Sequence, residues 1–154
     1  MIFVTVGTQL PFDRLIAAMD QVAARLDEPV VAQIGPSRYV LTNMQTVDRL
    51  TVAEFRGMFA DARAVVSHAG IGTLLTGMAL KKPLLMMARD AARGEHRNDH
   101  QKATLAALDG RAGVYRVENA DDILALLRAP ELTRAERGEA GQRQQLIASV
   151  RAVL

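Results

Sequence analysis

The loop "SHAGIGT" (67–73) holds the residue types in this chain that are best suited to chemistry. Gly70 and Gly72 let the backbone come close to a ligand. The helix predicted after them offers free N–H groups and the positive end of its dipole to an anion. Thr73 adds a hydroxyl, and His68 adds a donor for a phosphate oxygen. A tight strand-to-helix turn, with His68 capping nearby backbone, fits the same residues, so the loop alone leaves both interpretations open.

Two other loops are expected beside it, "GTQLPFD" (7–13) and "ARDAARGEHRNDHQ" (88–101). Each follows an apolar run, and in an open parallel sheet ligands bind beyond the carboxyl ends of the strands. Gly7 and Thr8 can therefore frame the same pocket. The chain has neither G-x-G-x-x-G nor a P-loop with its G-K-[ST], so standard dinucleotide and ATP sites lack their fingerprints.

Metal binding and hydrolase-type catalysis find little support in the sequence. His96 and His100 are four residues apart, but no third ligand is evident, so we predict no metal site and no cofactor. Ser67 and His68 are only sequence neighbours, and no G-x-S-x-G elbow exists. The acidic residues near the expected ligand edge are more typical of solvated loop or cap residues than of a base: Asp13, Asp90, Glu95 and Asp99. No catalytic residue is assigned.

Composition limits the class of protein. The 154 residues are 49% hydrophobic and 23% charged, and the net charge of +2 is too small to indicate nucleic-acid binding. There are no cysteines, which excludes disulfides and thiolate metal sites. No apolar run approaches the roughly 20 residues of a membrane helix, and "MIFVTVGTQ" has no basic leader. We therefore expect a cytoplasmic domain whose membrane contact is made through a partner.

Strand-like and helix-like segments alternate along the chain. Nearly continuous apolar runs predict strands at 2–6, 29–35, 64–68, 83–87 and 113–117, with less certain strands around 39–41 and 44. Helical spacing predicts helices at 11–26, 51–62, 72–80, 98–110, 119–127 and 133–154. Alternation of this kind indicates an α/β fold with a Rossmann-like parallel sheet and helices on both faces. Residues 1–154 are expected to form one domain.

Three stretches together resemble one family: "FVTVGTQLPFDRL", "SHAGIGT" followed by "KKPLL", and "NDHQ". They are similar to the C-terminal domain of family 28 glycosyltransferases, over about residues 1–128. The free-standing, single-domain kind is the most similar. It includes the catalytic subunit of the dolichol-linked GlcNAc transferase and bacterial exopolysaccharide glycosyltransferase subunits, and "GEHRNDHQ" is more like the bacterial type. The resemblance implies the donor-binding half of a GT-B fold.

The resemblance also implies residue roles. The diphosphate of the donor would be held at His68, Gly70, Gly72 and Thr73, and sugar hydroxyls at His100 and Gln101. Many relatives carry an acidic residue, which grips the ribose hydroxyls, where this chain has Thr76. A threonine lacks the paired, charge-assisted acceptors of a carboxylate. Ribose binding is then weaker, or Asp99 or a partner supplies the acid.

The resemblance implies an inverting glycosyltransferase subunit that transfers a hexose from a UDP-sugar to a lipid-linked acceptor in polysaccharide biosynthesis. The acceptor half is not in this chain, so a membrane-anchored partner subunit would provide it. The docking element we predict is the helix 133–154, whose apolar residues are helically spaced, although they could instead pack on the chain's own sheet. Two alternatives are a non-catalytic nucleotide-sugar-binding module that stabilises or regulates a partner, and the remnant of a two-half epimerase.

Overall fold

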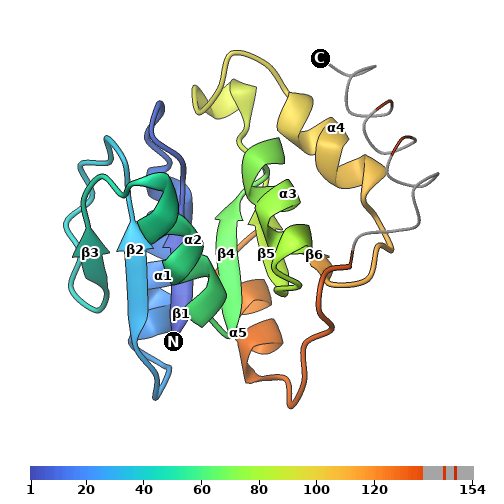
Figure 1. The fold of residues 1–154 in the computed structure, drawn as a ribbon. Helices are drawn as coiled ribbons and strands as arrows, with labels where there is room; N and C mark the ends of the chain where they lie inside the picture. The colour runs from blue at the N-terminus through green and yellow to red at the C-terminus, as the bar shows by residue number, and fades with distance from the viewer. Residues whose placement is uncertain (137–143, 145–147, 149–154) are drawn as a thin grey trace.

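The computed structural model describes residues 1–136, 144 and 148 of the chain (Figure 1). Six strands form one parallel sheet in the order β3-β2-β1-β4-β5-β6. This is the strand order of a doubly wound dinucleotide-binding fold, so the α/β fold class and the Rossmann-like sheet are confirmed. The strands are β1 (Ile2–Thr5), β2 (Val30–Gln33), β3 (Gln45–Val47), β4 (Ala64–His68), β5 (Leu84–Met87) and β6 (Val114–Arg116).

The central strands are buried because helices cover both faces of the sheet. Every residue of β1, β2 and β5 is buried, as the continuous apolar runs predicted. The helices are α1 (Asp13–Ala23), α2 (Val52–Asp61), α3 (Ile71–Ala79), α4 (His100–Ala107) and α5 (Ala120–Arg128), with a 3₁₀ turn η1 (Ala91–Arg93).

Two apolar cores lie on the two faces of the sheet. In Figure 1, α2 and α3 lie in front of the sheet, and α1 and α5 lie behind it. Side chains of α1 and α5 pack together with one side of β1, for example Leu15, Ile123 and Val4. Phe3 faces the other side, where it packs edge-on against Phe55 and Phe59 of α2. Leu74 of α3 and Leu105 of α4 complete this second core.

Helix starts agree with their sequence signals. At α2 the hydroxyl of Thr51 accepts from the Glu54 N–H, and the Glu54 carboxylate accepts from the Thr51 N–H, so a capping box starts the helix expected at 51–62. At α5 the side chain of Asn119 accepts from the Asp122 N–H. These local hydrogen bonds depend on neighbours in sequence, which is why the sequence predicts them well.

The strand expected around residues 39–41 does not form. Asp20, a buried residue of α1, accepts from the backbone N–H groups of Thr42 (3.2 Å) and Asn43 (2.8 Å). This long-range contact holds the preceding segment in irregular backbone, and pairing with β2 begins only at Gln45. The strand predicted around Met44 therefore lies one residue later, as β3.

The chain after α5 first runs without regular structure. Residues 131–136 are not helical, so the helix expected from Thr133 does not begin there, and nearly all of its remaining length lies outside the described residues. Ala135 is fully buried in the second core, and the Thr133 N–H donates to the Tyr115 hydroxyl at 2.8 Å. The 131–136 segment is therefore part of the folded domain.

Within the described part of the chain, no helix has the length and apolar character needed to cross a membrane.

Candidate functional site

The loops after β1 and β4 meet at the point where the strand order reverses. β1 pairs with β2 on one side and with β4 on the other. The helices that follow these two strands, α1 and α3, lie on opposite faces of the sheet (Figure 1), so the loops diverge. In doubly wound folds such a divergence is where ligands bind. The structure thus brings Gly7 and Thr8 next to the loop that contains His68 and Gly70.

A hollow of about 210 Å³ opens there, which we call the switch-point crevice. Three separate segments contribute to it, and the residues that line it are Val6, Gly7, Thr8, Gln9, Leu10, His68, Arg89, His96 and Gln101.

The imidazole of His68 fills the space between two glycines. A Cβ atom on Gly70 would lie 2.2 Å from Nε2 of His68, and one on Gly7 would lie 3.2 Å from Cε1. Gly7 also has a φ of +77°, which favours glycine. The sequence suggested that Gly70 makes room for a ligand, but the structure shows that it makes room for the imidazole. Gly72 is different, because no atom lies within 4 Å of the position of an added Cβ.

His68 is neutral at physiological pH. Its burial, the positive charge of Arg89 and the proximity of His96 lower the pKa of His68 to about 4, against a weaker opposing effect of the Thr5 carbonyl. Nδ1 lies 3.5 Å from that carbonyl oxygen, and the tautomer with its proton on Nδ1 donates to it. Nε2 is then an acceptor. His68 therefore brings no positive charge to the crevice and, in this tautomer, no donor at Nε2.

This buried histidine predicts acid sensitivity. The unfolded chain binds a proton on His68 near pH 6.5, and the folded chain only near pH 4. The contribution of His68 to stability is therefore complete above pH 6.5, falls by about 3 kcal/mol as the pH drops to 4, and levels off below that. Urea unfolding of the wild type and of His68→Gln between pH 7.5 and 4 measures this. If the unfolding free energy of the wild type depends on pH no more steeply than that of His68→Gln, the prediction is wrong.

The N-terminus of α3 is open beside the crevice. Gly70 is its N-cap and has no side chain to accept from the first turn. Among the described residues, no acceptor contacts the backbone N–H groups of Ile71, Gly72 or Thr73. Three free N–H groups and the helix dipole make an anion site. The Thr76 hydroxyl, one turn on, donates to the Gly72 carbonyl at 2.8 Å.

Arg89 provides a positive charge that the sequence analysis did not assign to the site. It lies two residues after the end of β5 and is only 2% exposed. Its guanidinium donates to the carbonyl oxygens of Val6 at 2.7 Å and Leu10 at 2.9 Å. An arginine immediately after a continuous apolar run was the signal in the sequence, but its acceptors are about 80 residues away.

The structure separates the predicted pair His100 and Gln101. Gln101 is buried and lines the crevice, and its side-chain oxygen accepts from the Arg89 N–H at 3.1 Å. This bond orients the amide and leaves its NH₂ group available to a ligand. His100 begins α4, where its N–H donates to the Asn98 side chain at 3.2 Å, and it does not line the crevice. His96, for which the sequence suggests only a metal-binding role, lines the crevice.

The carboxylates of the 88–101 loop are already bound. Glu95 accepts two hydrogen bonds from Arg14, both of 2.9 Å, which lower the pKa of Glu95 against the effect of burial. Lys102 lies 2.8 Å from Asp90 and 3.3 Å from Asp99. All three carboxylates are therefore in ion pairs with basic side chains. The described residues also contain no group of three His, Asp or Glu side chains that could hold a metal ion.

A second, larger hollow of about 680 Å³ adjoins the first at the ends of β2 and β3; we call it the β2–β3 hollow. Thr8 lines both hollows. The other residues that line the β2–β3 hollow are Gln33, Ile34, Gly35, Pro36, Ser37, Thr46, Val47, Asp48 and Arg49.

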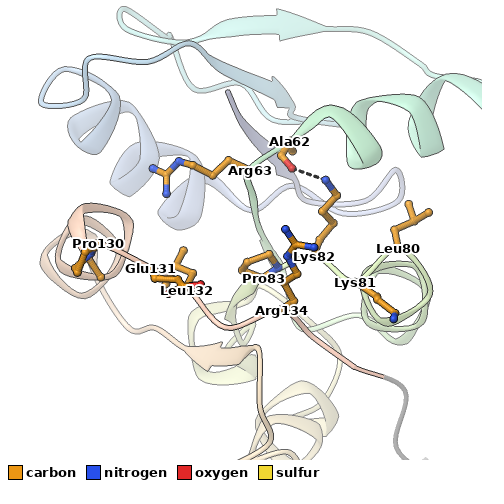
Figure 2. A pocket seen from close by; sticks show the side chains of 11 residues that line it. Ala62, Arg63, Leu80, Lys81, Lys82, Pro83, Pro130, Glu131, Leu132 and Arg134 are labelled. Atoms are coloured by element: carbon orange, nitrogen blue, oxygen red, sulfur yellow. Dashed lines mark hydrogen bonds between the residues drawn. The ribbon is translucent and has the colours of Figure 1, made fainter.

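A third hollow, of about 370 Å³, lies near the amino ends of β4 and β5 (Figure 2). It contains several basic side chains, among them Arg63, Lys81, Lys82 and Arg134. Lys82 donates to the carbonyl of Ala62 at 2.9 Å and to that of Ala60, at the carboxyl end of α2. Lys81 follows the carboxyl end of α3. Lys82 therefore offsets the carboxyl end of α2. Because the carboxyl ends of helices disfavour a bound anion, this hollow is not the candidate site.

Known proteins resemble this chain in sequence pattern and in fold. The model of the glycosyltransferase family 28 C-terminal domain matches residues 1–148. An NMR solution structure of ALG13 is similar over 96% of this chain and 94% of that chain, with 17% identity and a TM-score of 0.63. SnogD from Streptomyces nogalater, a glycosyltransferase, is similar over 99% of this chain and 38% of that chain, with 20% identity and a TM-score of 0.54.

The glycotransferase of kitacinnamycin is similar over 99% of this chain and 39% of that chain, with 16% identity and a TM-score of 0.61. At these identities the likeness is one of fold. The chain thus spans almost all of the ALG13 structure and about two-fifths of SnogD and the kitacinnamycin enzyme. No curated protein sequence matches it.

Proposed function

This chain belongs to the family of glycosyltransferase family 28 C-terminal domains, and we propose that it is the donor-binding subunit of an inverting glycosyltransferase that uses a UDP-sugar. The observation that carries the proposal is the open N-terminus of α3, which lies at the strand-order reversal beside a buried arginine. The family gives the class of reaction. The anion site gives the part of the donor that the chain would grip.

In this proposal the diphosphate lies over the first turn of α3. The N–H groups of Ile71, Gly72 and Thr73 face oxygens that gain negative charge as the UDP leaves, and fixed dipoles of this kind stabilise the transition state. The positive charge of Arg89 acts in the same direction. These groups are in place before the donor arrives, so they need little reorganisation during the reaction.

The two adjoining hollows suggest how the rest of the donor is placed. The sugar lies in the switch-point crevice, where the amide of Gln101 donates to a hydroxyl. The nucleoside lies in the β2–β3 hollow, which shares Thr8 with the crevice. Thr76 lines neither hollow, and its hydroxyl proton is used within α3, so this placement of the nucleoside does not include the ribose contact that the resemblance implied for Thr76.

Calorimetric titration with UDP, ADP, GDP and a panel of UDP-sugars tests the donor class. We expect UDP and at least one UDP-sugar to bind at the α3 N-terminus, with shifts of the Gly72 and Thr73 amide signals in NMR spectra. Absence of binding by every nucleotide at millimolar concentration would contradict the proposal.

Gln101→Ala should affect the binding of a UDP-sugar and the binding of UDP differently. We expect the substitution to lower the affinity for a UDP-sugar by about 2- to 12-fold, as for the loss of one hydrogen bond of about 0.5–1.5 kcal/mol. The affinity for UDP should change much less. The paired calorimetric titrations of UDP and the UDP-sugar on each protein provide the control. Equal weakening of both ligands would place Gln101 away from the sugar.

The acceptor requires a second protein in this proposal. A GT-B enzyme closes two halves around its substrates, and this chain corresponds to one of them. We therefore propose a membrane-anchored partner subunit that binds a lipid-linked acceptor for exopolysaccharide synthesis, with this chain held at the cytoplasmic face. The docking element proposed is the C-terminal segment, whose apolar residues at helical spacing are Leu146, Ile147, Val150, Val153 and Leu154.

A truncation after Glu136 tests this docking role. We expect the shortened chain to stay folded and bind UDP, but to lose co-purification with a co-expressed, membrane-anchored acceptor subunit. The cut must follow Glu136, because a cut at Pro130 would also remove Leu132 and the buried Ala135. A truncated chain that co-purifies as well as the full-length one would show that docking lies elsewhere.

One observation favours a second candidate, a nucleotide-sugar-binding module without turnover. Each carboxylate of the 88–101 loop is engaged by a basic side chain, so the loop offers no unpaired carboxylate as a base. Glycosyl transfer measured with the partner subunit present distinguishes the two. Donor binding without any transfer would favour the module.

A further inference from the structure

The loop after β1 is held in place mainly by one arginine from the opposite side of the crevice. Beyond its bonds to Val6 and Leu10, the guanidinium of Arg89 donates to the carbonyl oxygens of Pro11 and, at 3.3 Å, Glu95. Its Cζ atom lies 4.7 Å from the centre of the Phe12 ring. Arg89 therefore contacts both ends of the 6–11 segment and the residue that follows it.

The charge of Arg89 is buried without a carboxylate partner. Among the described residues, no Asp or Glu oxygen lies within 4.0 Å of its guanidinium nitrogens, and the nearby Glu95 carboxylate is taken by Arg14. Burying a charge is costly unless it is paired. The charge therefore favours an anion in the adjoining crevice, although the nearby Glu95 carboxylate also acts on it electrostatically.

The backbone of Arg89 also contacts the other side of the crevice. Its N–H donates to the side-chain oxygen of Gln101, so one residue ties the 6–11 segment to the N-terminal turn of α4. The two polar contacts differ in kind, because the guanidinium acts on the loop and the backbone acts on Gln101. Only the first depends on the side chain.

We propose that Arg89 is a positioning residue, which fixes the 6–11 segment at the crevice through its carbonyl contacts and supplies the positive field under the donor diphosphate. The proposal rests on the donor-binding function above. A planar fork with five donors suits this task, because it reaches several carbonyls at once, whereas a lysine ammonium at the same place reaches fewer of them.

Arg89→Lys and Arg89→Gln test the two parts of the proposal separately. The lysine keeps the charge and loses the fork, and the glutamine loses both. Arg128→Gln is the matched control, because Arg128 also donates to a backbone carbonyl, that of Arg25 at 2.9 Å, and lines neither ligand hollow. The measurements are hydrogen exchange of the amides of residues 7–10, NMR titration of His68, and calorimetry with UDP.

We expect faster exchange of residues 7–10, by about 10-fold or more, in both Arg89 variants and not in the control. UDP binding should fall by about 10-fold in Arg89→Lys, which loses carbonyl contacts of the 6–11 segment, and by about 100-fold in Arg89→Gln, which also loses the charge. The His68 titration should move to higher pH in Arg89→Gln, because the charged groups that act on the ring are Arg89 and His96, and only His96 would remain.

Unchanged loop exchange and an unchanged His68 titration in folded variants would overturn the proposal. So would unfolding of both variants, which would make Arg89 a residue of general stability. If the wild type binds no nucleotide, the donor function fails by itself, and the exchange and titration data still decide the role of Arg89.

Discussion

Gly72→Asp is expected to lower the affinity for UDP by about 100-fold or more while leaving the protein folded. The substitution places a carboxylate on the first turn of α3, where the backbone N–H groups would face the diphosphate, and like charges at such distances repel strongly. The fold should tolerate it, because no atom lies within 4 Å of the added Cβ and an acidic residue in the first turn suits the helix dipole.

Gly57→Asp is the matched control for this prediction. Gly57 lies in α2, is exposed, and likewise has no atom within 4 Å of an added Cβ, but it lies away from the α3 N-terminus. Calorimetry should show wild-type UDP binding for Gly57→Asp. If the folded Gly72→Asp protein binds UDP as tightly as the wild type does, the N-terminus of α3 is not the anion site.

Gly113→Ala is expected to cost about 3 kcal/mol or more of stability, the largest loss from any single methyl group that we predict. Its φ is +77°, and a Cβ would lie 2.1 Å from the backbone nitrogen of Ala135. Left-handed backbone costs a non-glycine residue about 1 kcal/mol or more, and overpacking adds about 1–3 kcal/mol. The 131–136 segment would have to leave the core to relieve the contact.

Gly110→Ala isolates the packing part of this loss. Gly110 has almost the same φ, +75°, but nothing lies within 4 Å of an added Cβ, so it bears the backbone cost alone. Urea unfolding of the two variants and the wild type gives both parts by difference. If the two variants lose the same stability, then the 131–136 segment is not packed against Gly113.

The two predictions bear on different parts of the proposed function. The first concerns the donor site and should leave stability almost unchanged. The second concerns how residues 131–136 are attached to the sheet, which happens away from the crevice. It should leave donor binding unchanged in the molecules that remain folded. Together they separate loss of ligand contacts from loss of fold.

The sequence by itself determined most of the secondary structure and the fold class. The buried strands were predictable because their runs are continuously apolar, and the start of α2 because Thr51 and Glu54 satisfy each other within one turn. The turn at 67–73 was predictable because small residues precede a helically spaced apolar run, and α3 begins there at Ile71. All of these signals depend on residues a few positions apart.

Tertiary structure decided which loops meet and what their side chains contact. The strand order places the β1 and β4 loops together, but a sequence does not state which strands pair. The segment at 39–41 is irregular because Asp20, some twenty residues earlier, binds Thr42 and Asn43. Only in the folded chain does the Arg89 guanidinium donate to its backbone carbonyls. The His68 ring likewise lies between Gly7 and Gly70 only there. Contacts between distant residues form at loop-closure cost and leave no local pattern, so only the structure shows them.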